Sequence, residues 1–340
     1  MHSRDTFPSL FRFPRRFQLR HACIFIILFV LAAGSARAQD KPRLEPTPTP
    51  GPIPTIDEEP LKIQTDLVTL TLTVHDNWGR YVSNLTKKHF SVFEDGVEQE
   101  ISFFSDVDAP ASIGIIYDIS GSMGSGKIVR SRRALERFML TSHPSDEFSL
   151  ITFNDKVQLL ADRTRDINAV LDKLTLVKPG GSTAFYDGVY LGADRVMRGS
   201  HAKKALLVIS DGQDNNSRYS YNEMRRLLKE SDVIIYAIGI YGDGEGSLGT
   251  FGEGSLNRLA ESTGGRAFYP GLTDGSFDEI CERIALELRH QYSIGYIPKD
   301  FRQDGKWRRL KVKVTPPRGM PQLSVRAREG YFATPLLPNK

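Results

Sequence analysis

Two aspartates, two serines and a threonine could supply oxygen ligands to a single metal ion. One aspartate and the two serines stand in the pattern Asp-x-Ser-x-Ser after the apolar run 112–117. The other aspartate follows the apolar run 205–210. Ligation by oxygen alone favours magnesium, calcium or manganese over zinc or copper. We expect Mg²⁺, and Mn²⁺ or Ca²⁺ would suit the same oxygens. The candidate metal ligands are Asp118, Ser120, Ser122, Thr183 and Asp211.

Strands and helices alternate through the middle of the chain, and this order predicts how the ligands are gathered. Strands are expected at 112–117, 148–153, 205–210 and 233–238, and helices at 127–141, 167–174, 184–197, 221–230, from 256 onward and at 277–290. Unbroken apolar strands suit a parallel sheet covered by helices on both faces. Loops at the carboxyl ends of such strands meet in one crevice. Residues 109–291 are therefore predicted to form an α/β domain, a doubly wound, mostly parallel, Rossmann-like sheet.

The three parts of this constellation, in this order, resemble the metal-ion-dependent adhesion site of von Willebrand factor A domains. That family combines Asp-x-Ser-x-Ser with a later Thr and a later Asp, which here are Asp118-Ile119-Ser120-Gly121-Ser122, Thr183 and Asp211. The resemblance implies that the serines, and often the threonine, contact the ion while the carboxylates frequently act through water. The other interpretation of these residues is a set of loop side chains that cap helices.

A nucleotide-binding loop is an alternative interpretation of the same segment. Residues 121–127 match Gly-x-x-x-x-Gly-Lys between a predicted strand and a predicted helix. That motif requires Ser or Thr at the next position to hold Mg²⁺, and Ile128 stands there. It also leaves Asp118 and Thr183 without a role. We therefore expect no nucleotide binding and place Lys127 at the solvent-exposed start of the first helix.

Catalysis at the ion would need a general base close to it. His143 and His201 are the nearest histidines in the sequence, and both are expected in surface turns. Ser122 lacks the Gly-x-Ser-x-Gly setting of a nucleophile elbow. The sequence therefore predicts a protein that is not an enzyme. The glycine-rich loop 241–254 follows a predicted strand and is expected to form a mobile rim of the metal edge that helps to choose the partner.

The first 38 residues have the pattern of a signal peptide. Arginines precede the apolar stretch 22–33, and Ala36-Arg37-Ala38 predicts cleavage after Ala38. The protein is accordingly expected to be exported, either periplasmic or secreted, and the alternative is an uncleaved membrane anchor. Residues 39–60 carry seven prolines and are expected to form an extended linker.

Removal of the signal changes the charge balance of the chain. Residues 1–38 hold six Arg and one Asp, so the rest keeps 39 of the 45 basic and 40 of the 41 acidic residues, a net charge near −1. No electrostatic reason to bind nucleic acid remains. Cys281 is then the one cysteine left, so no disulfide can form within the chain, and a helical pattern marks it as a small core residue.

Both flanks of the α/β region have β character. Residues 67–74, 309–314 and 323–328 alternate with period two, and further strands are expected at 90–93, 101–104 and 292–296. Neither flank has enough apolar residues for its own core. We expect residues 61–108 and 292–334 to form one β-sandwich into which the α/β domain is inserted; the alternative is two separate small β units.

The flanks also resemble those of exported A-domain proteins known from acidobacteria. The matching segments before the domain are Val74-x-Asp76-x-x-Gly79, Leu85-x-x-x-x-Phe90 and Phe93-Glu94-Asp95-Gly96, and those after it are Gln291-Tyr292-x-x-Gly295-Tyr296 and Arg328-x-Gly330-Tyr331. The expected function is exported adhesion: the ion holds a protein ligand through that ligand's Asp or Glu carboxylate. The alternative function is a metal-dependent scaffold subunit of a cell-envelope complex.

Overall fold

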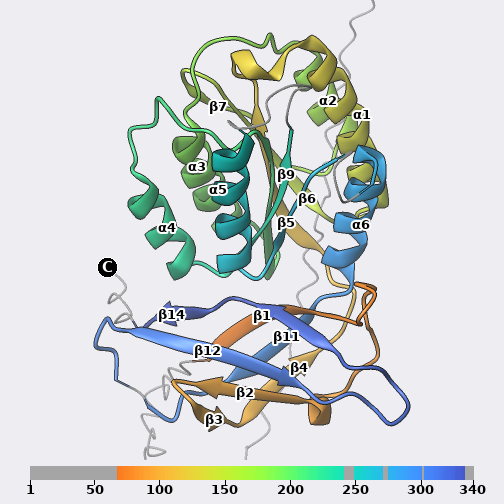
Figure 1. Cartoon of the computed structure of the whole chain (residues 1–340), viewed down its shortest axis with the longest axis vertical. Coiled ribbons are helices and arrows are strands. Elements are labelled where there is room, and N and C mark those ends of the chain that lie inside the picture. The colour runs from red at the N-terminus through yellow and green to blue at the C-terminus, as the bar shows by residue number, and fades with distance from the viewer. Residues whose placement is uncertain (1–66, 241–248, 271–274, 301, 334–340) are drawn as a thin grey trace, which may run out of the picture. The chain divides into compact units, whose positions relative to one another are not determined.

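The computed structural model describes residues 67–240, 249–270, 275–300 and 302–333. Its central sheet has six strands in the order β10-β9-β8-β5-β6-β7 (Figure 1). The strands are β5 (Ala111–Asp118), β6 (Glu147–Phe153), β7 (Val157–Thr164), β8 (Lys203–Ser210), β9 (Val233–Gly239) and β10 (Arg266–Phe268). All neighbouring pairs are parallel except β6 and β7. The predicted mostly parallel α/β sheet is therefore confirmed.

Helices cover both faces of this sheet, as Figure 1 shows. One apolar core lies between the sheet and α1 (Ser125–Thr141), α2 (Ile167–Thr175) and α6 (Phe277–Arg289). A second core lies between the other face and α3 (Phe185–Met197), α4 (Tyr221–Glu230) and α5 (Gly249–Ser262). Strands β5 and β9 are buried along their whole length, and β8 at every residue but Lys204, because both faces are covered. Cys281 is fully buried in the first core, as expected.

The two flanks of the chain share their sheets. One sheet has the order β13-β1-β11-β4 and the other β14-β12-β2-β3. The strands are β1 (Val68–His75), β2 (Phe90–Glu94), β3 (Val97–Gln99), β4 (Ile101–Ser105), β11 (Tyr292–Tyr296), β12 (Trp307–Val314), β13 (Ser324–Ala327) and β14 (Gly330–Phe332). Side chains from both sheets form a third core. The α/β domain is thus inserted into a β-sandwich built from both flanks.

Several elements differ from the prediction. Strands β3, β7, β10 and β14 were not predicted: three of them have only three residues, and β7 is a half-exposed edge strand without regular alternation. Helix α5 begins at Gly249, whereas the sequence predicts a start at 256. Glycine is a poor helix former, but a Cβ at Gly252 would lie 2.0 Å from the carbonyl oxygen of Asp211. Close contact with the loop after β8 therefore requires glycine there.

Three predicted segments lie outside the described residues: the signal peptide 1–38, the linker 39–60 and most of the loop 241–254. Within the described ranges, no helix is long and apolar enough to cross a membrane.

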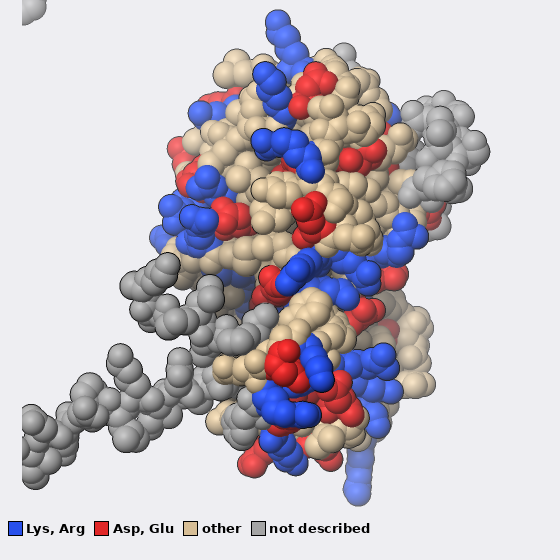
Figure 2. Space-filling view, turned by 90° about the vertical axis from the view of Figure 1, so that its left-hand side faces the viewer, with Lys and Arg blue, Asp and Glu red and all other residues tan. Residues whose placement is uncertain are grey.

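On the face drawn in Figure 2, Lys and Arg side chains are interleaved with Asp and Glu side chains.

Candidate metal centre

Asp118 ends the central strand β5 and is completely buried. The parallel register pairs Tyr117 with Ile209, so Asp118 lies level with Ser210 at the end of β8. The Asp118 carboxylate accepts the Ser120 backbone N–H at 2.8 Å through Oδ1 and the Ser210 hydroxyl at 2.7 Å through Oδ2. These two bonds fix its orientation at the carboxyl edge of the sheet.

Asp211 places a second buried carboxylate beside the first. It follows Ser210 directly, is 3% exposed and accepts the Gln213 backbone N–H through Oδ1. Within the described part of the chain, neither Asp118 nor Asp211 forms an ion pair with Lys or Arg. Burial raises the pKa of Asp118 to about 6, and the negative charge of Asp211 adds to this effect while hydrogen bonds from Ser120 and Ser210 oppose it. Two buried anions without a cationic partner fit a bound cation.

The serine pair supplies neutral oxygens next to these carboxylates. Ser120 and Ser122 flank Gly121, the first residue of a short 3₁₀ turn at Gly121–Met123, and their Oγ atoms lie 3.1 Å apart. Ser120 is buried, whereas Ser122 is exposed. The pair therefore reaches from the end of β5 to the solvent, as an ion open to a partner would require.

Thr183 is joined to the loop that follows Asp211. Its N–H donates to Asn215 Oδ1 at 2.8 Å, and its carbonyl accepts the N–H groups of Asn215 and Asn216. The Thr183 residue is 6% exposed. The segment before it pairs with the first loop, because Gly180 N–H donates to the Ile119 carbonyl and Gly121 N–H to the Gly181 carbonyl. The three segments that carry the predicted ligands are therefore joined by backbone hydrogen bonds.

A fourth segment, after β6, was missed by the sequence analysis. Asn154 Nδ2 donates to the Gly180 carbonyl, and Asp155 Oδ1 accepts the Ser182 N–H. A side chain at Gly181 would collide with Asp155, since its Cβ would lie 2.3 Å from Oδ2. The signal for these residues was present, because Asn154 and Asp155 follow the predicted strand 148–153 just as Asp118 and Asp211 follow theirs.

The beginning of α1 differs from a phosphate-binding loop. Lys127 already lies in the first turn of the helix, as predicted, but its ammonium does not simply face solvent: it donates to the Ser122 carbonyl at 2.9 Å. Ile128 is buried and packs in the core between the sheet and helices α1, α2 and α6. Neither side chain is arranged as the lysine and the magnesium-binding hydroxyl of a nucleotide site.

The residues present fit a hard divalent cation. No group of three or more His, Cys, Asp or Glu side chains suited to a metal was found among the described residues. The donor set at the carboxyl edge instead combines two carboxylates with hydroxyls, which suits oxygen-preferring Mg²⁺. The ion would be held by Asp118, Ser120, Ser122, Thr183 and Asp211. The segment that carries Thr183 would be positioned by Asn154, Asp155 and Asn215.

Comparisons with known proteins identify the domain. Residues 112–280 match the model of the von Willebrand factor type A domain. An uncharacterized protein from Borreliella burgdorferi is 26% identical over 220 residues, which cover 57% of this chain and 64% of that protein. The chain thus spans less than two thirds of the length of that relative.

Two solved structures illustrate the range of similar folds. The vWF domain of the type V pili tip protein Mfa5 from Porphyromonas gingivalis is 13% identical, covering 53% of this chain and 96% of that chain with a TM-score of 0.44. Proximal thread matrix protein 1 from the mussel byssus, with a zinc-occupied MIDAS motif, is 20% identical, covering 57% of this chain and 49% of that chain with a TM-score of 0.44. By the family match, this chain contains a von Willebrand factor type A domain at residues 112–280.

Proposed function

We propose that this domain is a non-enzymatic adhesion module that holds a protein partner through Mg²⁺ bound by Asp118, Ser120, Ser122, Thr183 and Asp211. The observation that carries the proposal is the pair of buried carboxylates, Asp118 and Asp211, which have no Lys or Arg partner in the described structure and adjoin two serine hydroxyls 3.1 Å apart. Burial of unpaired charge is costly, and a divalent ion would offset that cost.

The charge of the donor set supports recognition of an acidic partner. Two carboxylates balance a divalent ion, and the hydroxyls add ligands without adding charge. The ion then keeps an attraction for one more anionic oxygen at a position that water otherwise fills. A partner's Asp or Glu carboxylate can take this position from the solvent side, where Ser122 is exposed.

The positions of the histidines support binding without catalysis. His143 lies just before β6, and His201 lies just before β8 and donates its N–H to Ser112 at the start of β5. Both therefore belong to the amino ends of the strands, whereas the metal ligands lie at the carboxyl ends. The described loops at the metal edge contain no histidine or cysteine that could serve as a general base.

The proposal places this module outside the cytoplasm, periplasmic or secreted, because residues 1–38 have the pattern of a signal peptide. Sequencing the amino terminus of protein recovered from the native organism tests this part. Gln39 is expected as the first residue, and an intact Met1 would instead support an uncleaved anchor.

Partner capture with the metal controlled tests the adhesion function. The purified protein is immobilised, and extracellular and envelope proteins are offered in Mg²⁺ and in EDTA. Capture is expected in Mg²⁺ and not in EDTA, and Thr183→Ala should weaken it because one oxygen beside the open position is lost. Chemical amidation of the partner's carboxyl groups should also abolish capture. Full capture by folded, metal-free protein would overturn the proposal.

A further inference from the structure

A groove of about 590 Å³ lies between the end of helix α4 and the neighbouring strands β12 and β13. Its apolar floor is formed by Leu310, Val312, Val325 and Ala327. Among the described residues that line it, Glu329 is the one acid, and the basic residues are Lys229, Arg309, Lys311 and Arg328. Lys229 comes just before β9 begins, so the groove lies toward the amino ends of the central strands, away from the candidate metal centre.

Most of these basic side chains lack a carboxylate partner. Arg328 lies 3.7 Å from a carboxylate oxygen of Asp232. Among the residues that the structure describes, no ion pair involves the other three, Lys229, Arg309 and Lys311. The pKa of the Lys229 ammonium is lowered by burial and by the positive charge of Arg225, which the negative charge of Glu329 opposes in part. Positive charge therefore accumulates around the groove and favours a bound anion.

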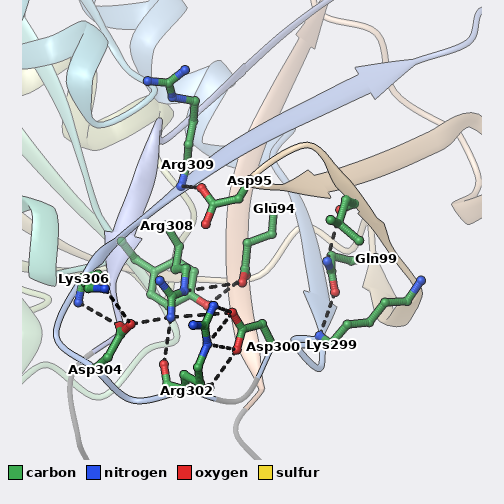
Figure 3. A network of polar contacts seen from close by, with 12 residues as sticks. Glu94, Asp95, Gln99, Lys299, Asp300, Arg302, Asp304, Lys306, Arg308 and Arg309 are labelled. Carbon is green, nitrogen blue, oxygen red and sulfur yellow. Dashed lines mark hydrogen bonds and ion pairs between the residues drawn. The ribbon is translucent and has the colours of Figure 1, made fainter.

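Alternation along β12 keeps its exposed cations apart from a neighbouring ion-pair network. Figure 3 shows Arg308 turned toward Asp304 in a cluster of ion pairs, while the side chain of Arg309 points away from that cluster. Successive side chains of a strand face opposite sides, so Lys311 and Lys313 share the outward face with Arg309. All three are exposed. Their charges therefore remain available to a ligand on this face of the strand.

A second groove, of about 610 Å³, continues the basic surface along the outward face of β12. It shares Trp307, Arg309 and Lys311 with the first groove. It adds Lys313 and the acid Asp95. Neighbouring side chains on one face of a strand are roughly 7 Å apart. The cations of β12 therefore form an evenly spaced row across two joined grooves, which suits a linear polymer with repeated anionic groups.

We propose that the two grooves bind one acidic polysaccharide, whose carboxylate or sulfate groups pair with Lys229, Arg309, Lys311 and Lys313. The cations line the walls of grooves, which suits a narrow chain better than the flat surface of a membrane. Lysines already lie over the rings of Trp307 and Phe93, so a nucleic acid base would have to displace one in order to stack there. Strands β13 and β14 lie beside β12, so a peptide could not pair with it as a further strand. The apolar floor can contact the C–H face of a sugar ring.

Oligosaccharide binding to the purified protein tests the proposal. The probe is a fluorescent oligomer of uronic acid, and a neutral glucose oligomer of the same length is its control. Fluorescence anisotropy is measured in EDTA, so that no ion at the proposed metal site can hold the carboxylates of the probe. The uronic acid oligomer is expected to bind at low salt and to be released at high salt, because salt screens exposed charges. The glucose oligomer should not bind.

Variants assign the binding to the grooves. Lys311 lines both of them, and Lys311→Glu should weaken binding about tenfold, since it replaces an attraction with a repulsion. Lys229→Gln removes one charge from the wall formed by α4 and should weaken binding about threefold. Exposed Lys173→Glu, on α2, is the matched control, and thermal unfolding checks each fold. No binding of the uronic acid oligomer, an equal loss in Lys173→Glu, or tighter binding of single-stranded DNA, polyglutamate or anionic lipid vesicles would overturn the proposal.

Discussion

The hydroxyl of Ser210 donates to Asp118 Oδ2 across 2.7 Å, linking the ends of β8 and β5. This bond follows directly from the register of the two parallel strands, which sets the residues side by side. Ser210 also accepts the Gly212 N–H, so this one serine holds both the Asp118 carboxylate and the turn that follows Asp211. The geometry of the candidate metal centre is therefore built into the central sheet.

Replacement of Asp118 by asparagine should abolish Mg²⁺ binding without unfolding the protein. In EDTA, Asp118→Asn should be at least as stable as the wild type, because the substitution removes a buried charge that lies near Asp211. Added Mg²⁺ at about 100 times its Kd should stabilise the wild type by about 2.7 kcal/mol but should not stabilise Asp118→Asn. Calorimetry with Mg²⁺ measures both effects. Exposed Asp172→Asn is the control, and equal stabilisation of both variants would contradict the site assignment.

Nucleotide binding should be absent despite the Gly-x-x-x-x-Gly-Lys match at 121–127. Ile128 packs in the core where a nucleotide site needs a hydroxyl, and the Lys127 ammonium is held by the Ser122 carbonyl. We expect no saturable ATP signal at millimolar nucleotide with Mg²⁺, measured by equilibrium dialysis. Saturable binding that Lys127→Ala removes would refute this prediction.

Much of the fold could be predicted because its signals are local. Apolar runs such as 112–117 and 233–238 form strands that helices cover on both faces of the sheet. The period-two alternation at 309–314 marks a strand with one buried face. The three parts of the ligand pattern stand next to these strands. Their location at one sheet edge follows from parallel pairing alone.

The elements that were missed depend on contacts between distant residues. Helix α5 begins among glycines because Gly252 must pass close to the Asp211 carbonyl, a tertiary contact that overrides helix propensity. Asn154 and Asp155 do follow a predicted strand, but they and Asn215 bond to loops roughly 30 residues away in the chain, so no local pattern shows which loop each one positions.

Asn215 should matter for Mg²⁺ binding although it is not a predicted ligand. Its Oδ1 accepts the Thr183 N–H at 2.8 Å and holds the threonine loop against the loop after β8. Asn215→Ala removes this acceptor and should cost about 1 kcal/mol of unfolding free energy. Affinity for Mg²⁺ should fall by severalfold, while Asn215→Asp, which keeps an acceptor oxygen, should retain it. Calorimetric titration of the two variants makes the comparison, and equal affinities would remove Asn215 from the site.

Glu287, near the end of α6, joins the α/β domain to the β-sandwich through buried polar contacts. Its Oε1 accepts from Arg326 of β13 at 2.6 Å, from Tyr236 of β9 at 3.1 Å and from Thr73 of β1 at 3.2 Å. The Glu287 residue is 1% exposed. Because Arg326 would lose its buried partner, Glu287→Gln should lower the free energy of unfolding at neutral pH by about 3 kcal/mol.

The destabilisation caused by Glu287→Gln should depend on pH with a definite sign. Burial alone would raise the pKa of Glu287, but its contacts with His75 and Arg326 outweigh that effect and lower the pKa below the ordinary value of 4.5. A carboxylate with a lowered folded-state pKa stabilises the protein above its unfolded-state pKa and loses this contribution as the pH falls through the folded-state value. The wild-type advantage should therefore be present above about pH 4.5 and shrink as the pH falls further. Urea unfolding in EDTA, with exposed Glu136→Gln as control, measures this advantage. An advantage that stayed constant down to pH 3 would show that the charge of Glu287 does not stabilise the junction.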